Sequence, residues 1–295
     1  MSSTIGPGQV PAPRPEYVRE QVGEQDFGVV EQPLTLWERL YGNGLLRKLL
    51  ILAVLAGIWQ AYALYLANPL VLPTFTATLQ TFMERIGSGE LVARSTTSIK
   101  VLLQGYAIGL ACAFVFTILA MSTRLGKDLL ETLTAMLNPL PAIALLPLAL
   151  VWLGLGNPSI VFVLVHAVMW PIALNTHGGF QSVSPTLRMV GRNYGLSGVG
   201  YVMRILVPAA FPSILSGLKV GWAFAWRTLI AAELVFGTTS GSGGLGWYIY
   251  ENKNLLDIPA VFAGLFTVII IGLLVESLIF RTIEQRTIRK WGMHS

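Results

Sequence analysis

The sequence predicts an all-helical, polytopic membrane protein with about six transmembrane helices. Two observations on composition and one on pattern lead to this prediction. Of the 295 residues, 54% are hydrophobic and only 12% are charged. The mean hydropathy is +0.64, so the chain lies outside the usual range of soluble globular domains. The apolar residues also gather in long runs, each near the roughly 20 residues that an α-helix needs to cross a bilayer.

Six apolar runs have this length, and each predicts one span. They are Leu49–Ala67, Val101–Met121, Leu133–Leu155, Ile160–Gly179, Ile214–Phe236 and Pro259–Phe280. Prolines interrupt two of these runs, at Pro139, Pro141 and Pro147 in the third and at Pro171 in the fourth. Because a proline removes a helical hydrogen bond, these positions are either kinks that serve packing or points of gating.

The distribution of basic residues predicts how the spans are oriented. With the N-terminus inside, the inner segments carry fourteen basic residues: Arg14, Arg19, Arg39, Arg47, Lys48, Arg124, Lys127, Arg188, Arg192, Arg204, Arg281, Arg286, Arg289 and Lys290. The outer segments carry four: Arg85, Arg94, Lys100 and Lys253. Cytoplasmic loops of membrane proteins are enriched in Lys and Arg, so we expect both termini in the cytoplasm.

The ends of the chain differ in composition from its middle. Residues 1–45 are rich in Pro, Ser, Gly and Glu and predict a disordered or interfacial cytoplasmic tail. Within it, Leu34–Leu46 has apolar residues at helical spacing and is either a helix on the membrane surface or a lead-in to the first span. Residues 46–284 form the predicted transmembrane domain, and residues 285–295 a cytoplasmic tail.

The residue content of the chain argues against disulfide, metal-binding, nucleic-acid-binding, catalytic and ATP-binding functions. The single cysteine, Cys112, lies in an apolar run, so neither a disulfide framework nor a cysteine metal site is expected. The net charge of +5 has an explanation in the basic cytoplasmic loops, so we expect no nucleic-acid partner. The spans show no paired carboxylates or nucleophile with a base, so we expect no catalytic residue. No GKS or GKT follows the glycine-rich segment Gly237–Gly246, so this chain has no ATP site of its own.

The polar segment Ser184–Pro212 predicts a helical hairpin outside the membrane. Ser184 is a favourable N-cap with Pro185 at the first helical position, and Gly195 is placed to end that helix in a left-handed conformation. A first helix over about Pro185–Tyr194 follows. Ser197 is placed to cap a second helix that Pro208 and Pro212 end. Both helices are amphipathic, and together they offer a surface for a partner outside the membrane.

Besides Lys219 near its cytoplasmic end, the fifth predicted span contains two charged residues, Arg227 and Glu233. A charge at the bilayer centre costs about 3 kcal/mol or more, so such residues face a water-filled path or a partner. They stand six positions apart, which is a poor spacing for a direct pair on one helix. Arg227 therefore either lines a translocation pathway and favours anions, or pairs with another helix.

The hairpin carries a pattern of a known family. Gly195 is followed ten positions later by Ile205, and then by Val207 and Pro208. This spacing resembles the Glu-Ala-Ala, Gly, Ile-x-Leu-Pro loop of permease subunits of bacterial ABC importers. The Glu-Ala-Ala positions are occupied here by Met189, Val190 and Gly191, so the acidic residue is absent. The stretches NPLPAIALLPLALVWLGLG, PAAFPSILSGLKVGWAFAWRTLIAAELVFG and GLGWYIYE look like the nitrate, sulfonate and taurine branch in particular. The resemblance covers about Leu46–Glu284.

This resemblance implies a type I ABC importer permease-like fold with a coupling-helix loop at about 182–212. It implies two ATP-binding cassette subunits that grip this loop, with ATP and Mg²⁺ bound there and no cofactor in this chain. It further implies a second permease copy, expected as a homodimer, an extracytoplasmic solute-binding protein, and a location in the bacterial inner membrane. The solute is expected to be a small anion, and the sequence leaves its identity open. The alternative is an ion-coupled secondary transporter, which would leave the capped hairpin without an explanation.

Overall fold

The computed structural model describes residues 42–236 and 243–288, and every regular element there is a helix. The chain divides between Val54 and Leu55 into two compact units. The helix α2 (Gly44–Leu66) crosses this division, and all later helices belong to the second unit. Most of the predicted tail, including most of the segment Leu34–Leu46, lies outside the described residues.

Four further helices are long and apolar enough to cross a membrane. These are α4 (Glu90–Ser122), α7 (Asn157–Ser182), and the continuous stretches Gly198–Val235 and Ile258–Arg286. The first stretch contains α9 (Gly198–Tyr201), the π-helical turn η2 (Val202–Leu206) and α10 (Val207–Phe236). The second contains α12 (Ile258–Leu274), the π-helical turn η3 (Val275–Phe280) and α13 (Arg281–Arg286). With α2, five of the six predicted spans are confirmed as helices.

The third predicted span, Leu133–Leu155, is not one continuous helix. It consists of α5 (Arg124–Leu137), a 3₁₀ turn η1 (Ala142–Leu145) and α6 (Leu146–Leu153), with a bend of 90° between α5 and the rest. The bend falls where Pro139 and Pro141 stand two residues apart. Each proline lacks a donor and disfavours helical geometry in the residue before it, so the helix cannot continue. Counted as one broken span, the pair brings the number to six.

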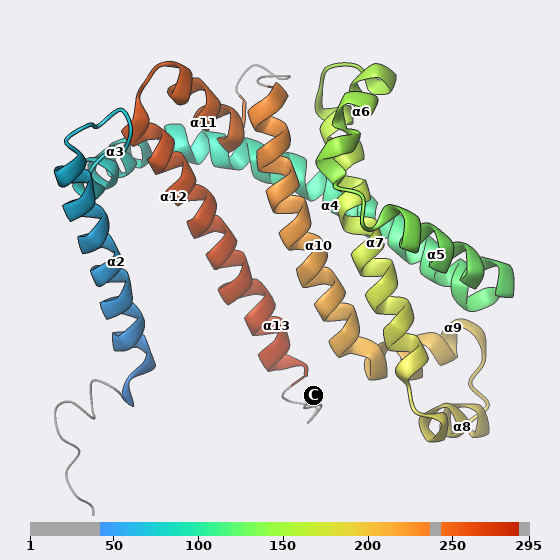
Figure 1. The fold of residues 1–295 in the computed structure, drawn as a ribbon. Coiled ribbons are helices and arrows are strands. Elements are labelled where there is room, and N and C mark those ends of the chain that lie inside the picture. Colours follow the sequence, from blue (N-terminus) through green and yellow to red (C-terminus); the bar gives the residue numbers. More distant parts are fainter. Residues whose placement is uncertain (1–41, 237–242, 289–295) are drawn as a thin grey trace, which may run out of the picture. The chain divides into compact units, whose positions relative to one another are not determined.

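The helix α7 is the most buried of the long helices in the described residues, and α4 and α10 pack on it (Figure 1). Glycines allow both contacts. A Cβ added at Gly109 of α4 would stand 2.7 Å from Val168, and one added at Gly217 of α10 would stand 2.9 Å from Asn175. Gly105 and Gly221 meet α7 in the same way. Each pair of glycines four residues apart thus lets its helix approach α7 closely.

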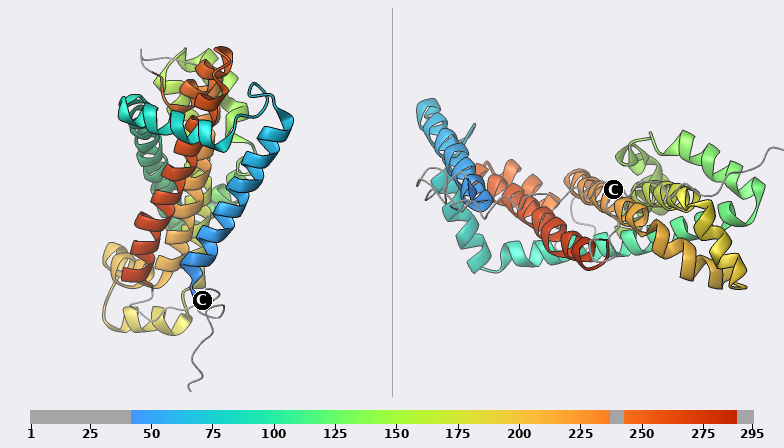
Figure 2. Two further views of the ribbon diagram at one scale, coloured as in Figure 1. Left: turned by 90° about the vertical axis from the view of Figure 1, so that its left-hand side faces the viewer. Right: turned by 90° about the horizontal axis from the view of Figure 1, so that it is seen from below.

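Short helices gather at the two ends of the long ones. At one end lie α3 (Phe75–Gly87), α6 and α11 (Leu245–Asn254), and at the other lie α8 (Pro185–Asn193) and α9 (Figures 1 and 2). The helix α13 also ends at that second end. The hairpin was predicted from the sequence, whereas α3 and α11 were not.

The expected end of the second hairpin helix at Pro208 and Pro212 is wrong. The chain stays helical from Gly198 through both prolines to Val235. Pro208 is the second residue of α10, and only Val207 separates it from η2. Because a π-helical turn bonds each N–H to the fifth residue back, it disturbs the α-helical ladder locally, at the place where a proline offers no N–H.

Candidate functional site

The helix α8 begins as its sequence predicts. Ser184 is the N-cap, and its hydroxyl oxygen accepts a hydrogen bond from the Leu187 N–H at 3.3 Å. Pro185 takes the first helical position, where a missing N–H costs nothing. The helix runs over Pro185–Asn193, within one residue of the predicted range.

The end of α8 is fixed by Gly195, which adopts the left-handed conformation with φ of 71°. Its N–H donates to the Arg192 carbonyl at 2.9 Å, and the next N–H, of Leu196, donates to the Gly191 carbonyl at 3.1 Å. These two bonds make a Schellman motif, which satisfies carbonyls that a helix end leaves free. The predicted role of Gly195 is confirmed.

Gly191 holds the two arms of the hairpin together. It is buried, and a Cβ added to it would stand 2.9 Å from Ile205 Cγ1 and 3.0 Å from Tyr201 Cε2. The third Glu-Ala-Ala position and the isoleucine of the motif are therefore in direct contact. Only a residue without a side chain lets α8 approach η2 this closely.

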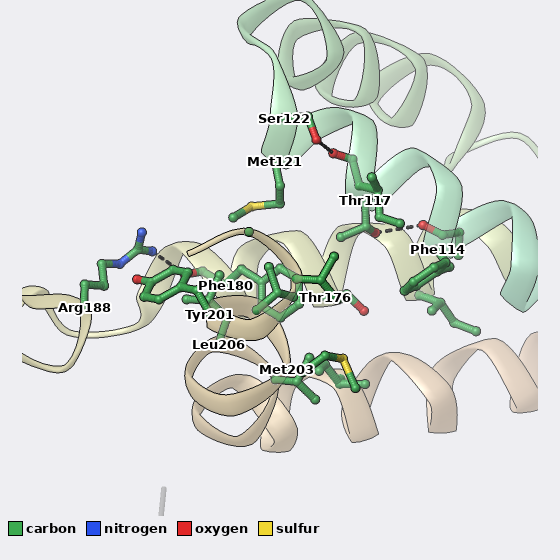
Figure 3. A pocket seen from close by; sticks show the side chains of 18 of the residues that line it. Phe114, Thr117, Met121, Ser122, Thr176, Phe180, Arg188, Tyr201, Met203 and Leu206 are labelled. Atoms are coloured by element: carbon green, nitrogen blue, oxygen red, sulfur yellow. Dashed lines mark hydrogen bonds between the residues drawn. The ribbon is translucent and has the colours of Figure 1, made fainter. Parts of the chain in front are cut away.

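Arg188 ties α8 to the end of α7. Its Nη2 donates to the Phe180 carbonyl at 2.5 Å (Figure 3). Its Nε donates to the Val183 carbonyl at 3.1 Å. A cation at the C-terminus of a helix is favourable because it meets free carbonyls and the negative end of the helix dipole. Phe180 and Val183 also form a small apolar core with Leu206, the last residue of η2, and Ala210 of α10.

Some apolar side chains of the α8 segment are exposed. Met189 is 58% exposed, Val190 41%, and Tyr194, which follows the helix, 82%. These residues are exposed although Gly191 between them is buried. The helix α8 is thus held in place by the contacts of Gly191 and Arg188, and it carries apolar side chains that no other part of the described chain covers.

Arg227 lies in α10 with its guanidinium exposed. Its Nε donates to the Ala223 carbonyl one turn back at 3.0 Å, and its central carbon stands 5.1 Å from the centre of the Phe224 ring. Within residues 42–236 and 243–288 it forms no ion pair. Ser216, Val220 and Phe224 are exposed on the same stripe of α10.

Glu233 has the opposite environment, because it is only 4% exposed. The Ser98 hydroxyl of α4 lies 2.8 Å from each of its carboxylate oxygens and donates to them, and the Gly246 N–H of α11 donates to Oε2 at 2.8 Å. The Leu245 N–H in turn donates to the Ser98 oxygen at 2.8 Å. One carboxylate thus joins α10, α4 and the start of α11.

Ion pairs surround this junction. Arg94 of α4 donates to Glu251 of α11 at 2.8 Å and to the Gly243 carbonyl at 3.2 Å. Arg85 of α3 pairs with Glu90 at 2.6 Å and with Asp257, the N-cap of α12, at 3.3 Å. The hydrogen bond to Glu90 raises the pKa of the Arg85 guanidinium above its ordinary value. In the part of the chain that the structure describes, no group of three or more His, Cys, Asp or Glu could hold a metal ion.

Comparison with known proteins assigns the chain to a family. Residues 105–289 match the family described as binding-protein-dependent transport system inner membrane component. That match covers the hairpin, α10 and Glu233. The chain belongs to this family of permeases.

Individual relatives agree with the family. The permease is 32% identical over 236 residues to an ABC transporter permease protein of Methanocaldococcus jannaschii, covering 79% of this chain and 87% of the other. It is 28% identical over 285 residues to an aliphatic sulfonates transport permease protein of Bacillus subtilis, covering 96% and 95%. It is 30% identical over 250 residues to a nitrate import permease protein of Synechocystis, covering 81% and 88%.

The fold of the permease also has a solved counterpart. A crystal structure described as an amino acid ABC transporter with histidines matches with a TM-score of 0.52 at 15% identity, over 71% of this chain and 98% of that one. The likeness shows the fold that the sequence predicts, an all-helical membrane permease.

The structure brings some of the predicted site residues of the permease together and separates others. Gly191 and Ile205 touch, and Val207 and Pro208 follow where η2 joins α10. Arg227 and Glu233 have no contact with each other. Sequence reasoning missed Ser98 and Gly246, because the Ser98–Glu233 contact joins residues 135 positions apart and no local pattern marks it.

Proposed function

We propose that this permease is the membrane subunit of an ATP-driven importer that moves a small anion into the cytoplasm. The solute would be a sulfonate, taurine, nitrate or a similar anion. Relatives named for aliphatic sulfonates and nitrate support this class. The hairpin is the observation that supports an ATP-driven mechanism. A helix outside the spans with exposed apolar side chains has the properties of a docking surface, here for a separate ATPase.

The docking partners would be two ATP-binding cassette subunits, each gripping one α8 through Met189, Val190 and Tyr194. They would bind ATP and Mg²⁺ and perform the hydrolysis, so this chain is not itself an enzyme. A second permease copy, in a homodimer, would complete the pathway in the lipid bilayer, and an extracytoplasmic solute-binding protein would deliver the anion.

The orientation in this proposal has the hairpin and both termini in the cytoplasm of a bacterial cell. The count of basic residues supports it. The arrangement of helices supports it as well, because α8 and the end of α13 lie at the same end of the second unit, and both carry arginines (Figure 1). The opposite end, with α3 and α11, would face the solute-binding protein.

Arg227 would line the translocation pathway and favour anions. Its guanidinium lies in a membrane-spanning helix, yet it is exposed and forms no ion pair with a described residue. A charge so placed needs a polar path or a partner chain. The same role for Glu233 has less support, since both of its carboxylate oxygens already accept hydrogen bonds from Ser98 and Gly246.

The decisive experiment is purification of the tagged full chain from its native membrane in mild detergent. We expect a stoichiometric ATPase subunit and ATP hydrolysis that vanadate inhibits. Tyr194→Asp would place a charge in the apolar face and should release the ATPase, whereas Tyr194→Phe should retain it. The melting temperature of both variants should match that of the wild type, because Tyr194 is exposed. Active uptake without a partner or hydrolysis would contradict the proposal and favour the ion-coupled secondary transporter.

A further inference from the structure

A groove with a volume of about 800 Å³ lies between the second half of α4, the last turns of α7 and the hairpin (Figure 3). This volume is within the range of about 300–1,000 Å³ that is typical of sites for small molecules. The side chains of its walls are largely apolar and include Phe114, Ile118, Met121, Phe180, Val199 and Met203. Val199 is 79% exposed, although it belongs to the hairpin rather than to the middle of a span.

One end of the groove is cationic. Arg188 and Arg192 of α8 both line it. Arg188 uses Nε and Nη2 on the carbonyls that end α7. Arg192 is exposed and bonds to no other side chain in the described part of the chain. The groove thus joins apolar walls to a guanidinium that is available for an anion, which is the chemistry of an amphiphile with one anionic end.

The groove does not belong to the surface that carries Arg227. It lies on the side of α10 that α4 covers, where the Tyr106 hydroxyl donates to the Leu218 carbonyl at 3.0 Å. Arg227 follows Leu218 by nine residues, which is about two and a half helical turns, so it points away from α4. A molecule in the groove would therefore stand apart from the proposed pathway.

The depth of the groove matches the edge of a bilayer. It is lined by Ser122, the last residue of α4, and by residues of the final turns of α7, and its cationic end belongs to α8 beyond both spans. Apolar walls inside the spans and arginines just outside them follow the order of acyl chains and headgroup in a lipid monolayer. Basic pockets between helix ends on the cytoplasmic side suit anionic headgroups.

We propose that this groove binds an anionic phospholipid of the inner leaflet. Its acyl chains lie between α4 and the α9–η2 segment, and its phosphate meets Arg192, with Arg188 beside it. The lipid then contacts α8, the helix that carries the proposed ATPase-docking residues Met189 and Tyr194. The charge of the headgroup can therefore affect how α8 is held against the rest of the permease.

The test is native mass spectrometry of the purified full chain with added phosphatidylglycerol or phosphatidylcholine that have the same acyl chains. We expect the anionic lipid to be retained preferentially. Arg192→Gln should weaken phosphatidylglycerol binding about fivefold, the effect of one basic residue near an anionic surface. Arg204→Gln is the matched control, because Arg204 is an exposed arginine of the same hairpin that does not line the groove, and it should change nothing.

A second pair of variants tests the apolar part. Ile118→Trp should fill the groove and weaken the binding of both lipids, whereas Leu119→Trp, an equally exposed neighbour outside the lining, should not. Equal retention of the two lipids by the wild type, or equal loss with Arg204→Gln, would overturn the proposal. So would displacement of the lipid by free inorganic phosphate, which would make this a site for a soluble anion. None of these readouts needs ATP or a partner chain, so failure here leaves the importer proposal standing.

Discussion

The two ends of the helix that runs from Gly198 to Val235 are held in different ways. Near its far end, the buried Glu233 accepts hydrogen bonds from α4 and α11, and the Arg94–Glu251 ion pair lies beside this junction. At its near end, Leu206 and Ala210 pack on Phe180 and Val183 at the end of α7, and this contact is apolar.

This difference indicates which end is free to move. Hydrogen bonds to a buried carboxylate are directional, and an unpaired buried group is costly, so the far end resists small displacements. Apolar contacts have no preferred direction and tolerate sliding. A pull on α8 would therefore tilt the helix about its Glu233 end, and Arg227, between the two, would move with it.

The largest expected effect is at the far end. Glu233→Ala leaves Ser98 and the Gly246 N–H without their acceptor, and we expect it to lower the free energy of unfolding by about 3 kcal/mol. Thermal denaturation in mild detergent measures this. Glu276→Ala is the control, because that carboxylate is 62% exposed and stands 3.9 Å from Lys219, and its loss should cost about 0.5 kcal/mol or less. Equal effects of the two changes would remove the contrast between the ends.

The next effect concerns the packing of the hairpin. Gly191→Val forces a side chain against Ile205 and Tyr201, so α8 must move away from η2, at a cost of about 1–3 kcal/mol. We also expect uncoupling, seen as ATP hydrolysis by the purified complex that solute no longer stimulates. Gly200→Ala is the control in the same hairpin, since an added Cβ there meets nothing within 4 Å. Normal coupling in Gly191→Val would show that this contact does not transmit force.

A smaller effect is expected at the end of α8. Gly195→Ala has space for its Cβ but must adopt a φ of 71°, which costs about 1 kcal/mol. The melting temperature should fall slightly. Gly178→Ala, in α7 with nothing within 4 Å of the added Cβ, should instead be neutral or stabilising. If both alanines behaved alike, the left-handed cap would not contribute to stability.

The smallest effect on stability, with a clear effect on transport, is expected for Arg227. Because its guanidinium is exposed, Arg227→Gln should change the free energy of unfolding by less than about 0.5 kcal/mol. Uptake of a labelled anion into proteoliposomes holding the whole transporter should fall about tenfold, as for the loss of one charged hydrogen bond. Arg227→Lys should retain more uptake. A large loss of stability instead would identify Arg227 as part of an ion pair between helices.

What the sequence predicted well depends on chemistry within a few residues. The start of α8 at Ser184 and its end at Gly195 follow from side-chain capping and from the conformational freedom of glycine, both of which are local. The break at Pro139 and Pro141 was also visible as an interruption. Its angle was not, because the direction in which a chain leaves a proline break depends on what the next helix packs against.

The parts that escaped prediction depend on partners far away in the chain. Ser98 and Gly246 are unremarkable alone, and only the fold brings them to Glu233. The prediction that the second hairpin helix ends at Pro208 was wrong for a related reason. Prolines usually end helices, but the turn before this one bonds in a pattern that sequence periodicity does not reveal.

The π-helical turn Val202–Leu206 also has a geometric consequence. Such a turn amounts to one additional residue in an α-helix, and one residue corresponds to a rotation of about 100° around the axis. The turn therefore sets the angular phase between the hairpin and everything beyond it. If it relaxed to regular α-helix while the Glu233 junction kept the far end in place, α9 and α8 would rotate around the helix axis relative to Arg227.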